Sequence, residues 1–242
     1  MKNTYRIANK NIEIDSMYED VHRMCEAYLT CNAPEIFVKT GCDEIEFERK
    51  KSIRNDELNG ISAVDHRESY LETLAVYRQI AERMPDYNTL LFHGSCVSVD
   101  GEAYLFAAES GTGKSTHTRL WRQYLGDRAV MVNDDKPLIR IEKGSAIVYG
   151  TPWNGKHRLG NNISVPLRAI CLLERGAENS IERISKKEAL PFIIKQTYRP
   201  ASTSALAKTL GLIDNLNPDF YRLKCNMDIS AAELSYGVMS TK

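Results

Sequence analysis

The segment that most constrains this chain is Ala108–Thr116, "AESGTGKST", which is rich in small residues and carries a single lysine. An apolar run, "EAYLFAA", leads into it, and a helical pattern, "THTRLWRQYL", follows it. A glycine-rich loop between a strand and a helix matches the phosphate-binding P-loop pattern, with Ala108 in place of the first glycine. The alternative is an ordinary glycine-rich turn with a chance lysine, and the flanking strand and helix argue against it.

Each part of this loop suits the binding of a nucleotide. Glycines let backbone N–H groups turn toward phosphate oxygens. Lys114 places a charge at the β- and γ-phosphates, the Ser115 hydroxyl suits Mg²⁺, and the helix that begins there adds its positive dipole end. We therefore expect ATP and Mg²⁺ as cofactors. The predicted nucleotide-binding residues are Glu109, Ser110, Gly111, Thr112, Gly113, Lys114, Ser115, Thr116 and, from a later loop, Lys156.

A pair of carboxylates follows further along the chain. "AVMVNDD" is an apolar strand that ends in Asp134 and Asp135. One carboxylate can hold Mg²⁺ while the other accepts the proton of an attacking hydroxyl. An Asp pair by itself is more often a solvated turn, but its place after a P-loop makes it a candidate for catalysis.

Two further segments carry candidate residues. His93, in "FHGS", precedes the strand that feeds the loop, where it either orients a catalytic carboxylate or is structural. The segment "TPWNGKHR", Thr151–Arg158, combines a tryptophan with basic side chains. It either closes over the phosphates or the acceptor, with Lys156 as a phosphate ligand, or is a surface hairpin anchored by Trp153.

Composition excludes several classes of protein. The 242 residues include 32 Lys plus Arg and 32 Asp plus Glu, so the formal net charge is zero and no global basic field attracts nucleic acid or a membrane. The six cysteines form no Cys-x-x-Cys pair of the kind that binds zinc. No run approaches the roughly 18 apolar residues of a membrane span, and the N-terminus lacks a signal-peptide core. We expect a reduced, soluble, cytoplasmic protein.

The pattern of apolar and polar runs divides the chain into a small α+β lobe at residues 1–86 and a P-loop domain at residues 87–242. In the lobe, the sequence predicts two strands around the Asn9–Asn11 turn and a helix capped by Ser16. Strands are expected at "EIFVKT" and "EIEFER", and a loop at "RKKSIRNDELNG". A long helix follows, "RESYLETLAVYRQIAERM", with an apolar face expected at Tyr70, Leu74, Tyr77 and Ile80.

From Leu90 onward, short β-type runs dominate. Turns are expected at Asp100–Gly101 and Lys143–Gly144, and strands at "RAVMVN", "VPLRAICLLERG" and "FYRLKCN". Helices are expected at "SKKEALPFIIKQTY", "ASTSALAKTLGLIDNL" and "SAAELSYGVM". The pattern predicts a mostly β core with flanking helices.

Together, "HGS", "SGTGKST" and "VNDD" resemble the kinase domain of HPr kinase/phosphorylase and, more distantly, ATP-dependent phosphoenolpyruvate carboxykinase. "PWNGK", "LRAICLLERG" and the end "FYRLKCN…AAEL" resemble the shorter HPr-kinase-like proteins. The resemblance covers residues 88–237 and implies an HPr-kinase-like P-loop fold, of mixed α+β or α/β class, for the second domain. The first 86 residues resemble no family.

The resemblance also implies roles for individual residues. Lys114 would bind nucleotide, Ser115 would bind Mg²⁺, and Asp134 would act as the base toward a serine hydroxyl. Asp135 would lie at the metal or the lysine, and the two Asp roles can be exchanged. Members of the family form hexamers, so a homo-oligomer is compatible with the resemblance. The family's Glu-Ile-Arg-Gly segment has no counterpart at "IVYGTPWNGK", so the resemblance does not extend to phosphorylase activity or to HPr as substrate.

The leading hypothesis is an ATP-dependent kinase that transfers the γ-phosphoryl group to a hydroxyl of a protein, a peptide or a small metabolite. A nucleotide-binding regulatory module without phosphotransfer is the alternative, and it would need Lys114 and Ser115 but no base. A carboxykinase is disfavoured, because the chain is too short for that active site and lacks an evident basic cluster for oxaloacetate.

Overall fold

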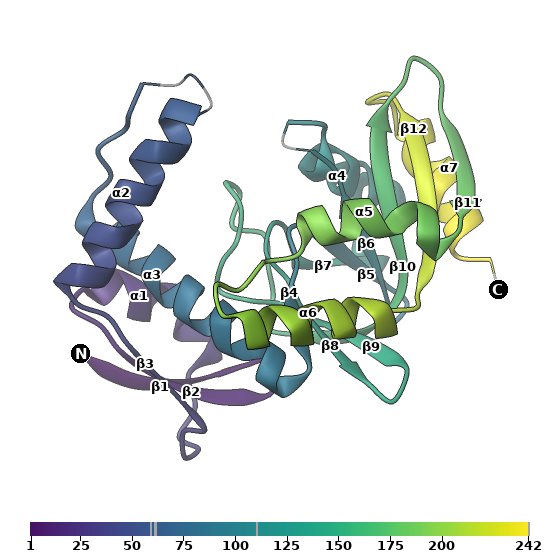
Figure 1. The fold of residues 1–242 in the computed structure, drawn as a ribbon. Coiled ribbons are helices and arrows are strands. Elements are labelled where there is room, and N and C mark those ends of the chain that lie inside the picture. Colours follow the sequence, from purple (N-terminus) through teal and green to yellow (C-terminus); the bar gives the residue numbers. More distant parts are fainter. Residues whose placement is uncertain (59, 61, 110, 242) are drawn as a thin grey trace. The chain divides into compact units, whose positions relative to one another are not determined.

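The structure, a computed structural model, describes residues 1–58, 60, 62–109 and 111–241, and the elements named below lie within them. The chain divides into two compact units, Met1–Arg83 and Met84–Lys242. Figure 1 shows the elements of both units.

Unit 1 is built on a small sheet with the strand order β1-β2-β3. β1 (Lys2–Ile7) and β2 (Lys10–Asp15) form an antiparallel hairpin, and β3 (Ile36–Lys39) pairs with β2 in parallel. The hairpin turn falls at Ala8 and Asn9, which adopt φ of 47° and 57°. Positive φ at both central residues matches the right-handed twist of the two strands.

The helices of unit 1 correct part of the sequence-based prediction. α1 (Glu19–Met24) is capped by Tyr18 and not by Ser16, whose hydroxyl lies 2.9 Å from His22 Nε2. α2 (Cys42–Leu58) replaces both the strand expected at "EIEFER" and the loop expected after it. Along α2, ion pairs join Glu46 to residues three and four positions later, Arg49 and Lys50. Such pairs support a helix of polar composition that has little apolar periodicity.

α3 (Glu68–Arg83) is the helix predicted by the sequence, and Ile80 of the predicted face is buried, but the buried face is centred on other residues. Tyr70 is 49% exposed, whereas Leu71 and Glu72 are buried. The Glu72 carboxylate accepts hydrogen bonds from the N–H groups of Met17 and Tyr18 and from the Thr40 hydroxyl, each at 2.7 Å. An acidic residue is therefore part of the core of unit 1. The apolar pattern of the helix does not mark it, because its burial depends on these three donors.

Unit 2 contains one large mixed sheet with the strand order β4-β8-β9-β10-β6-β5-β7, to which β12 and β11 are added beside β10 (Figure 1). The strands are β4 (Thr89–Leu91), β5 (Ser95–Val99), β6 (Glu102–Ala107), β7 (Ala129–Asn133), β8 (Leu138–Glu142), β9 (Ser145–Tyr149), β10 (Ser164–Arg175), β11 (Ser180–Ile184) and β12 (Asp219–Cys225). The predicted turns at Asp100–Gly101 and Lys143–Gly144 are confirmed, each with φ between 49° and 82°.

Helices flank the sheet on both faces. The helices are α4 (Lys114–Leu125), α5 (Lys186–Gln196), α6 (Thr203–Asn215) and α7 (Ile229–Met239). Leu105 and Ala107 of β6 pack in one core cluster with residues of α5 and α6, while Tyr104 and Phe106 pack in a second cluster with residues of α4 and α7. The alternation along β6 places both faces of this strand in the core. The predicted mixed α+β fold, with a mostly β core and flanking helices after a small lobe, is confirmed.

The cysteines are free thiols, and three of them, Cys25, Cys96 and Cys171, are buried. Burial raises the pKa of the Cys25 thiol to about 12, so this group is unreactive at neutral pH. Among the helices of the described residues, none has the length and apolar character needed to cross a membrane.

Candidate nucleotide and phosphotransfer site

The strand order brings the predicted site residues to one edge of the sheet. β5 lies between β6 and β7 and is antiparallel to both, so β6 and β7 run in the same direction. Ser95 pairs with Phe106, and Cys96 pairs with Asn133, which places the ends of β6 and β7 level with the start of β5. The loop after β6, the Asp pair after β7 and His93 before β5 therefore converge on this edge.

The loop after β6 has the backbone of a phosphate cradle. Gly111 and Gly113 adopt φ of 78° and 114°, and α4 begins directly after Gly113. The first hydrogen bond of α4 joins the His117 N–H to the Gly113 carbonyl at 2.9 Å. The N–H groups of residues 114–116 lie before this bond, at the start of the helix. Such N–H groups at a helix start form an anion site. Ser115 is exposed at this position, whereas Ser110, also predicted as a nucleotide ligand, lies outside the described residues.

Lys114 lies where the loop meets the Asp pair. Its Nζ donates to the Ala108 carbonyl at 3.1 Å, and its side chain is half-buried. Burial lowers the pKa of the Lys114 amine, while the charge of Asp135 acts in the opposite direction. The predicted phosphate-binding lysine and one predicted carboxylate are thus within electrostatic reach of each other.

Two side chains from other elements support the loop. Glu109 pairs with Lys195 of α5 at 2.6 Å, and Arg175 at the end of β10 donates to the Gly111 carbonyl at 2.7 Å. Inside the loop, the Thr112 N–H donates to the Glu109 carbonyl at 3.1 Å. The Glu109 side chain is paired with Lys195, and its role as a nucleotide ligand stays a prediction.

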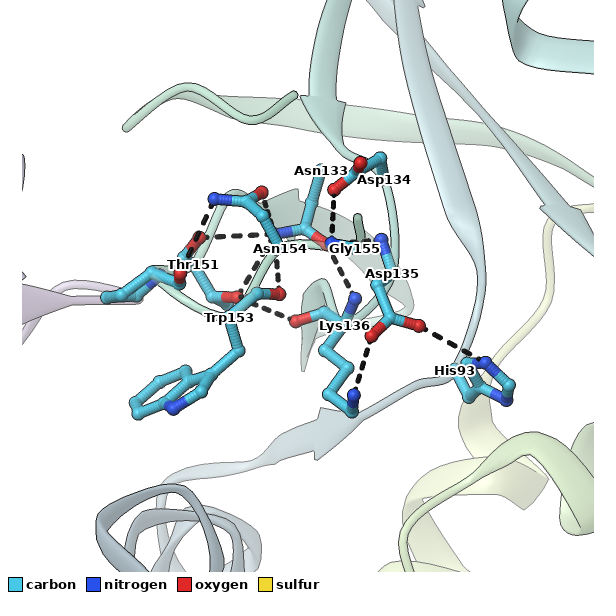
Figure 2. A network of polar contacts seen from close by, with 10 residues as sticks. His93, Asn133, Asp134, Asp135, Lys136, Thr151, Trp153, Asn154 and Gly155 are labelled. Carbon is cyan, nitrogen blue, oxygen red and sulfur yellow. Dashed lines mark hydrogen bonds and ion pairs between the residues drawn. The ribbon is translucent and has the colours of Figure 1, made fainter. Parts of the chain in front are cut away.

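Asp135 is the carboxylate that contacts an imidazole and a lysine (Figure 2). His93 Nε2 lies 3.2 Å from one of its oxygens, and Lys136 Nζ lies 2.6 Å from the other. Burial by itself would raise the pKa of Asp135, but the hydrogen bond from His93 and the charge of Lys136 outweigh it and lower the pKa to about 2. Asp135 is therefore ionised at physiological pH, as a metal ligand must be.

Asp134 has different surroundings. It is only 5% exposed, and its carboxylate accepts the Gly155 N–H at 2.7 Å (Figure 2). It also accepts the Leu159 N–H at 3.4 Å. A Cβ atom on residue 155 would lie 3.2 Å from the same carboxylate, so a glycine allows this close approach. Asp134 thus holds segment 155–159 against the end of β7.

Asn133 connects the Asp pair to the loop that follows β9. Its place before the two acids is the one sequence signal for this role. Its side-chain carbonyl accepts the N–H groups of Asp135 and Lys136, at 2.9 and 2.6 Å, and so shapes the acidic turn. Its amide nitrogen lies 3.1 Å from both the Thr151 carbonyl and the Asn154 Oδ1 (Figure 2). Asn133 is fully buried, so these contacts satisfy a polar group that would otherwise be costly to bury.

The segment Thr151–Arg158 is attached to the protein at its start and exposed at its end. The indole of Trp153 is buried, at 5% exposure. Of the alternatives considered for this segment, the burial fits a surface hairpin anchored by Trp153. Lys156, His157 and Arg158 are exposed. The role of Lys156 as a phosphate ligand stays a prediction.

The residues present fit a magnesium ion that is held partly by phosphate. Within the described part of the chain, no group of three or more His, Cys, Asp or Glu side chains is placed to hold a metal by itself. Mg²⁺ bound with nucleotide takes only one or two carboxylates, and its other ligands are phosphate oxygens and water. Asp135 and the exposed hydroxyl of Ser115 are oxygen donors of the kind that such a site uses.

Comparison with known proteins places this chain in a family. The model of the family described as "SynChlorMet cassette protein ScmC" matches residues 61–205, more than half of the chain, and includes the P-loop and the Asp pair. The chain belongs to this family. Comparison with curated proteins finds no match by sequence.

A solved structure, the Hpr(Ser) kinase/phosphatase from Coxiella burnetii, aligns with 62% of this chain and 88% of its own, at 11% identity and a TM-score of 0.38. This resemblance is distant, so the function proposed below depends on the residues of this chain.

Proposed function

We propose that this protein is an ATP-dependent kinase that transfers the γ-phosphoryl group of Mg-ATP to a hydroxyl group. The observation that carries the proposal is the convergence of a P-loop backbone, with Lys114 at the start of α4, and an acidic turn that ends β7. A nucleotide-binding protein without chemistry needs the first of these features but not the second.

Each residue has a proposed task in phosphoryl transfer. The N–H groups at the start of α4 and the Lys114 amine would bind the phosphates and stabilise the charge that develops on them. Bound Mg-ATP supplies the phosphoryl group and a cation that neutralises its oxygens. Asp135 and Ser115 would hold that cation, and His93 would keep the Asp135 carboxylate in position.

Asp134 is our proposed base. In the transfer, the acceptor oxygen forms a bond to the γ-phosphorus, the bond from that phosphorus to the bridging oxygen breaks, ADP leaves, and the hydroxyl proton passes to the carboxylate. Each oxygen of a carboxylate has a second lone pair, so a carboxylate that accepts backbone N–H groups can still accept a proton. Because Asp134 is nearly buried, an acceptor would reach it only when segment 155–159 moves. This role therefore couples chemistry to that segment.

The direct test is nucleotide binding by a Lys114→Ala variant. Removal of the amine should weaken Mg-ATP binding at least tenfold and abolish turnover, because no other described lysine lies at the start of α4. Lys187→Ala, a change at an exposed position on α5, is the matched control and should bind Mg-ATP normally. Titration calorimetry on the three proteins measures the affinity. Equal affinity and equal turnover in wild type and Lys114→Ala would exclude this P-loop as the nucleotide site.

The regulatory alternative gives a different result in the same assays. Wild type would bind Mg-ATP through Lys114 but show no hydrolysis or phosphotransfer above that of a variant lacking both carboxylates. Slow hydrolysis by water serves as the readout until an acceptor is identified.

A further inference from the structure

An open cavity of about 530 Å³ lies beside β7, and the proposed reaction makes no use of it. We call it the β7 cavity. Its lining residues come from the end of α4, from β7 and from segment 158–161, and they include Arg122, Asp127, Val130, Met131, Arg158 and Asn161.

The β7 cavity presents two guanidinium groups that form no ion pair among the described residues. Arg122 is half-buried and Arg158 is exposed. Among the described residues neither forms an ion pair or a side-chain hydrogen bond, whereas the neighbouring Arg128 is paired with Asp100 at 2.5 Å. Asp127 is the one acidic residue that lines the cavity. Planar guanidinium groups bind carboxylates through paired hydrogen bonds, so this cavity suits an acidic ligand.

The position of the cavity separates it from the predicted phosphate cradle. Arg122 follows Lys114 by eight residues on the same helix, a separation of about 12 Å along the axis. Arg122 is therefore too far along α4 to contact phosphates bound at the helix start. Phosphates held by Lys114 therefore do not account for Arg122.

The cavity is connected to the Asp pair through one segment. Arg158 adopts φ of 51°, and its N–H donates to the Gly155 carbonyl at 3.0 Å. The N–H of the next residue, Leu159, donates to the Asp134 carboxylate. The side-chain amide of Asn161 donates to the Met131 carbonyl of β7, and its backbone N–H donates to the Val132 carbonyl. The segment that carries Arg158 is thus the one that must move for an acceptor to reach Asp134.

An extended peptide fits this arrangement better than a compact metabolite. β7 is the last strand in the sheet order, and Val130 is 43% exposed. Val130 precedes Asp134 by four residues, a distance of about 13 Å along an extended strand. A chain lying along β7 would place an acidic residue at the arginines and a hydroxyl at Asp134 when the two are about four residues apart.

We propose that the β7 cavity binds an acidic segment of a peptide or protein acceptor, with carboxylates at Arg122 and Arg158. This inference rests on the proposed function, since it names the class of acceptor for that site. It also assigns the exposed end of the Thr151–Arg158 segment to the acceptor and not to the nucleotide.

The test uses fluorescein-labelled peptides and the full chain. One peptide alternates Asp and Ala and ends in a single Ser, and the other has Asn in place of each Asp. By anisotropy, without nucleotide, wild type should bind the Asp peptide at least tenfold more tightly than the Asn peptide, and added salt should weaken that binding. Equal affinity for the two peptides would overturn the proposal.

Variants locate the binding site. Arg122→Glu with Arg158→Glu should weaken binding of the Asp peptide at least tenfold and leave the Mg-ATP affinity unchanged. Lys143→Glu with Lys187→Glu makes the same change in net charge outside the cavity and should have little effect. An equal loss in this control would mean non-specific attraction, and a tenfold loss of Mg-ATP affinity in the arginine variant would assign the arginines to the nucleotide. Either result contradicts the proposal.

A single exposed change keeps the test decisive if the double variant does not fold, as circular dichroism would show. Arg158→Gln should weaken binding of the Asp peptide about threefold or more, and unchanged binding would count against the proposal. The peptide measurements need no nucleotide, so a failure of the kinase proposal appears separately, as an absence of Mg-ATP binding by wild type.

Discussion

Asp134 and Asp135 are adjacent in sequence but have different environments. Asp135 contacts His93 and Lys136 and lies within electrostatic reach of Lys114, whereas Asp134 accepts backbone N–H groups of segment 155–159. Both residues lie in the turn that follows β7, where their side chains meet different partners. Asp135 therefore lies on the side of the predicted phosphate site. Asp134 contacts segment 155–159, which the proposed mechanism requires to move.

Substitution of each acid by its amide should separate the two roles. Asp134→Asn should retain Mg-ATP binding and lose about a hundred- to ten-thousand-fold in turnover, or roughly 3–5 kcal/mol of barrier, because an amide cannot take the hydroxyl proton. Asp135→Asn should weaken Mg-ATP binding itself. Calorimetry and an ATP hydrolysis assay on both variants give the answer. If Asp134→Asn abolishes binding and Asp135→Asn does not, the roles must be exchanged.

Asp135 also makes a pH-dependent contribution to stability. Its pKa is about 2 in the folded chain, below the ordinary value of 3.8. The ionised form therefore stabilises the folded state above about pH 4, and this stabilisation is lost as the pH falls toward 2. The difference in unfolding free energy between wild type and Asp135→Asn should be up to about 2 kcal/mol at pH 6 and should shrink between pH 4 and pH 3. Urea unfolding measures it, and a difference independent of pH would contradict this origin.

At the scale of elements, the start of α4 depends on the backbone of one residue. Gly113 adopts φ of 114°, and a Cβ atom there would meet nothing closer than Thr116 Cβ at 4.0 Å. There is space for a side chain, so the requirement for glycine comes from the conformation alone. This conformation lies directly before the first turn of α4, whose N–H groups are the proposed phosphate ligands.

Gly113→Ala should therefore change nucleotide binding more than it changes the fold. We expect a loss of about 1–2 kcal/mol in stability from backbone strain and at least a tenfold loss in Mg-ATP affinity. Gly101→Ala is the matched control, because Gly101 has φ of 82° in the β5–β6 turn and open space around it. It should show a similar loss in stability with normal affinity. If both variants bind Mg-ATP alike, the conformation of Gly113 does not serve the nucleotide.

At the scale of the whole molecule, the chain consists of two compact units, and the proposed site lies entirely in Met84–Lys242. A ligand that binds only the folded state stabilises the part of the chain whose unfolding releases it. Mg-ATP at a hundred times its dissociation constant should therefore add about 2.7 kcal/mol of protection to amides of unit 2. Hydrogen exchange should show this in β5, β6, β7 and α4. Protection confined to Met1–Arg83 would place the nucleotide in the other unit.

Most of the strands and helices of unit 2, and the segments that carry the candidate site, could be predicted from the amino-acid sequence alone. Apolar runs between Gly and Asp turns specify strands through local chemistry, and the P-loop spacing specifies a strand, a turn and a helix together. In unit 1 the same approach failed for α2, where polar residues at helical spacing pair with one another and leave little apolar pattern.

The partners of the polar residues, by contrast, became known from the folded chain. Glu72 is buried because three donors from distant segments meet its carboxylate, and Asn133 joins two loops because the ends of β7 and β9 come together. The division of tasks between Asp134 and Asp135 likewise depends on groups that are tens of residues away along the chain, Lys114, His93 and Gly155. Local sequence carries no record of such long-range contacts, because strand order and register create them when the sheet forms.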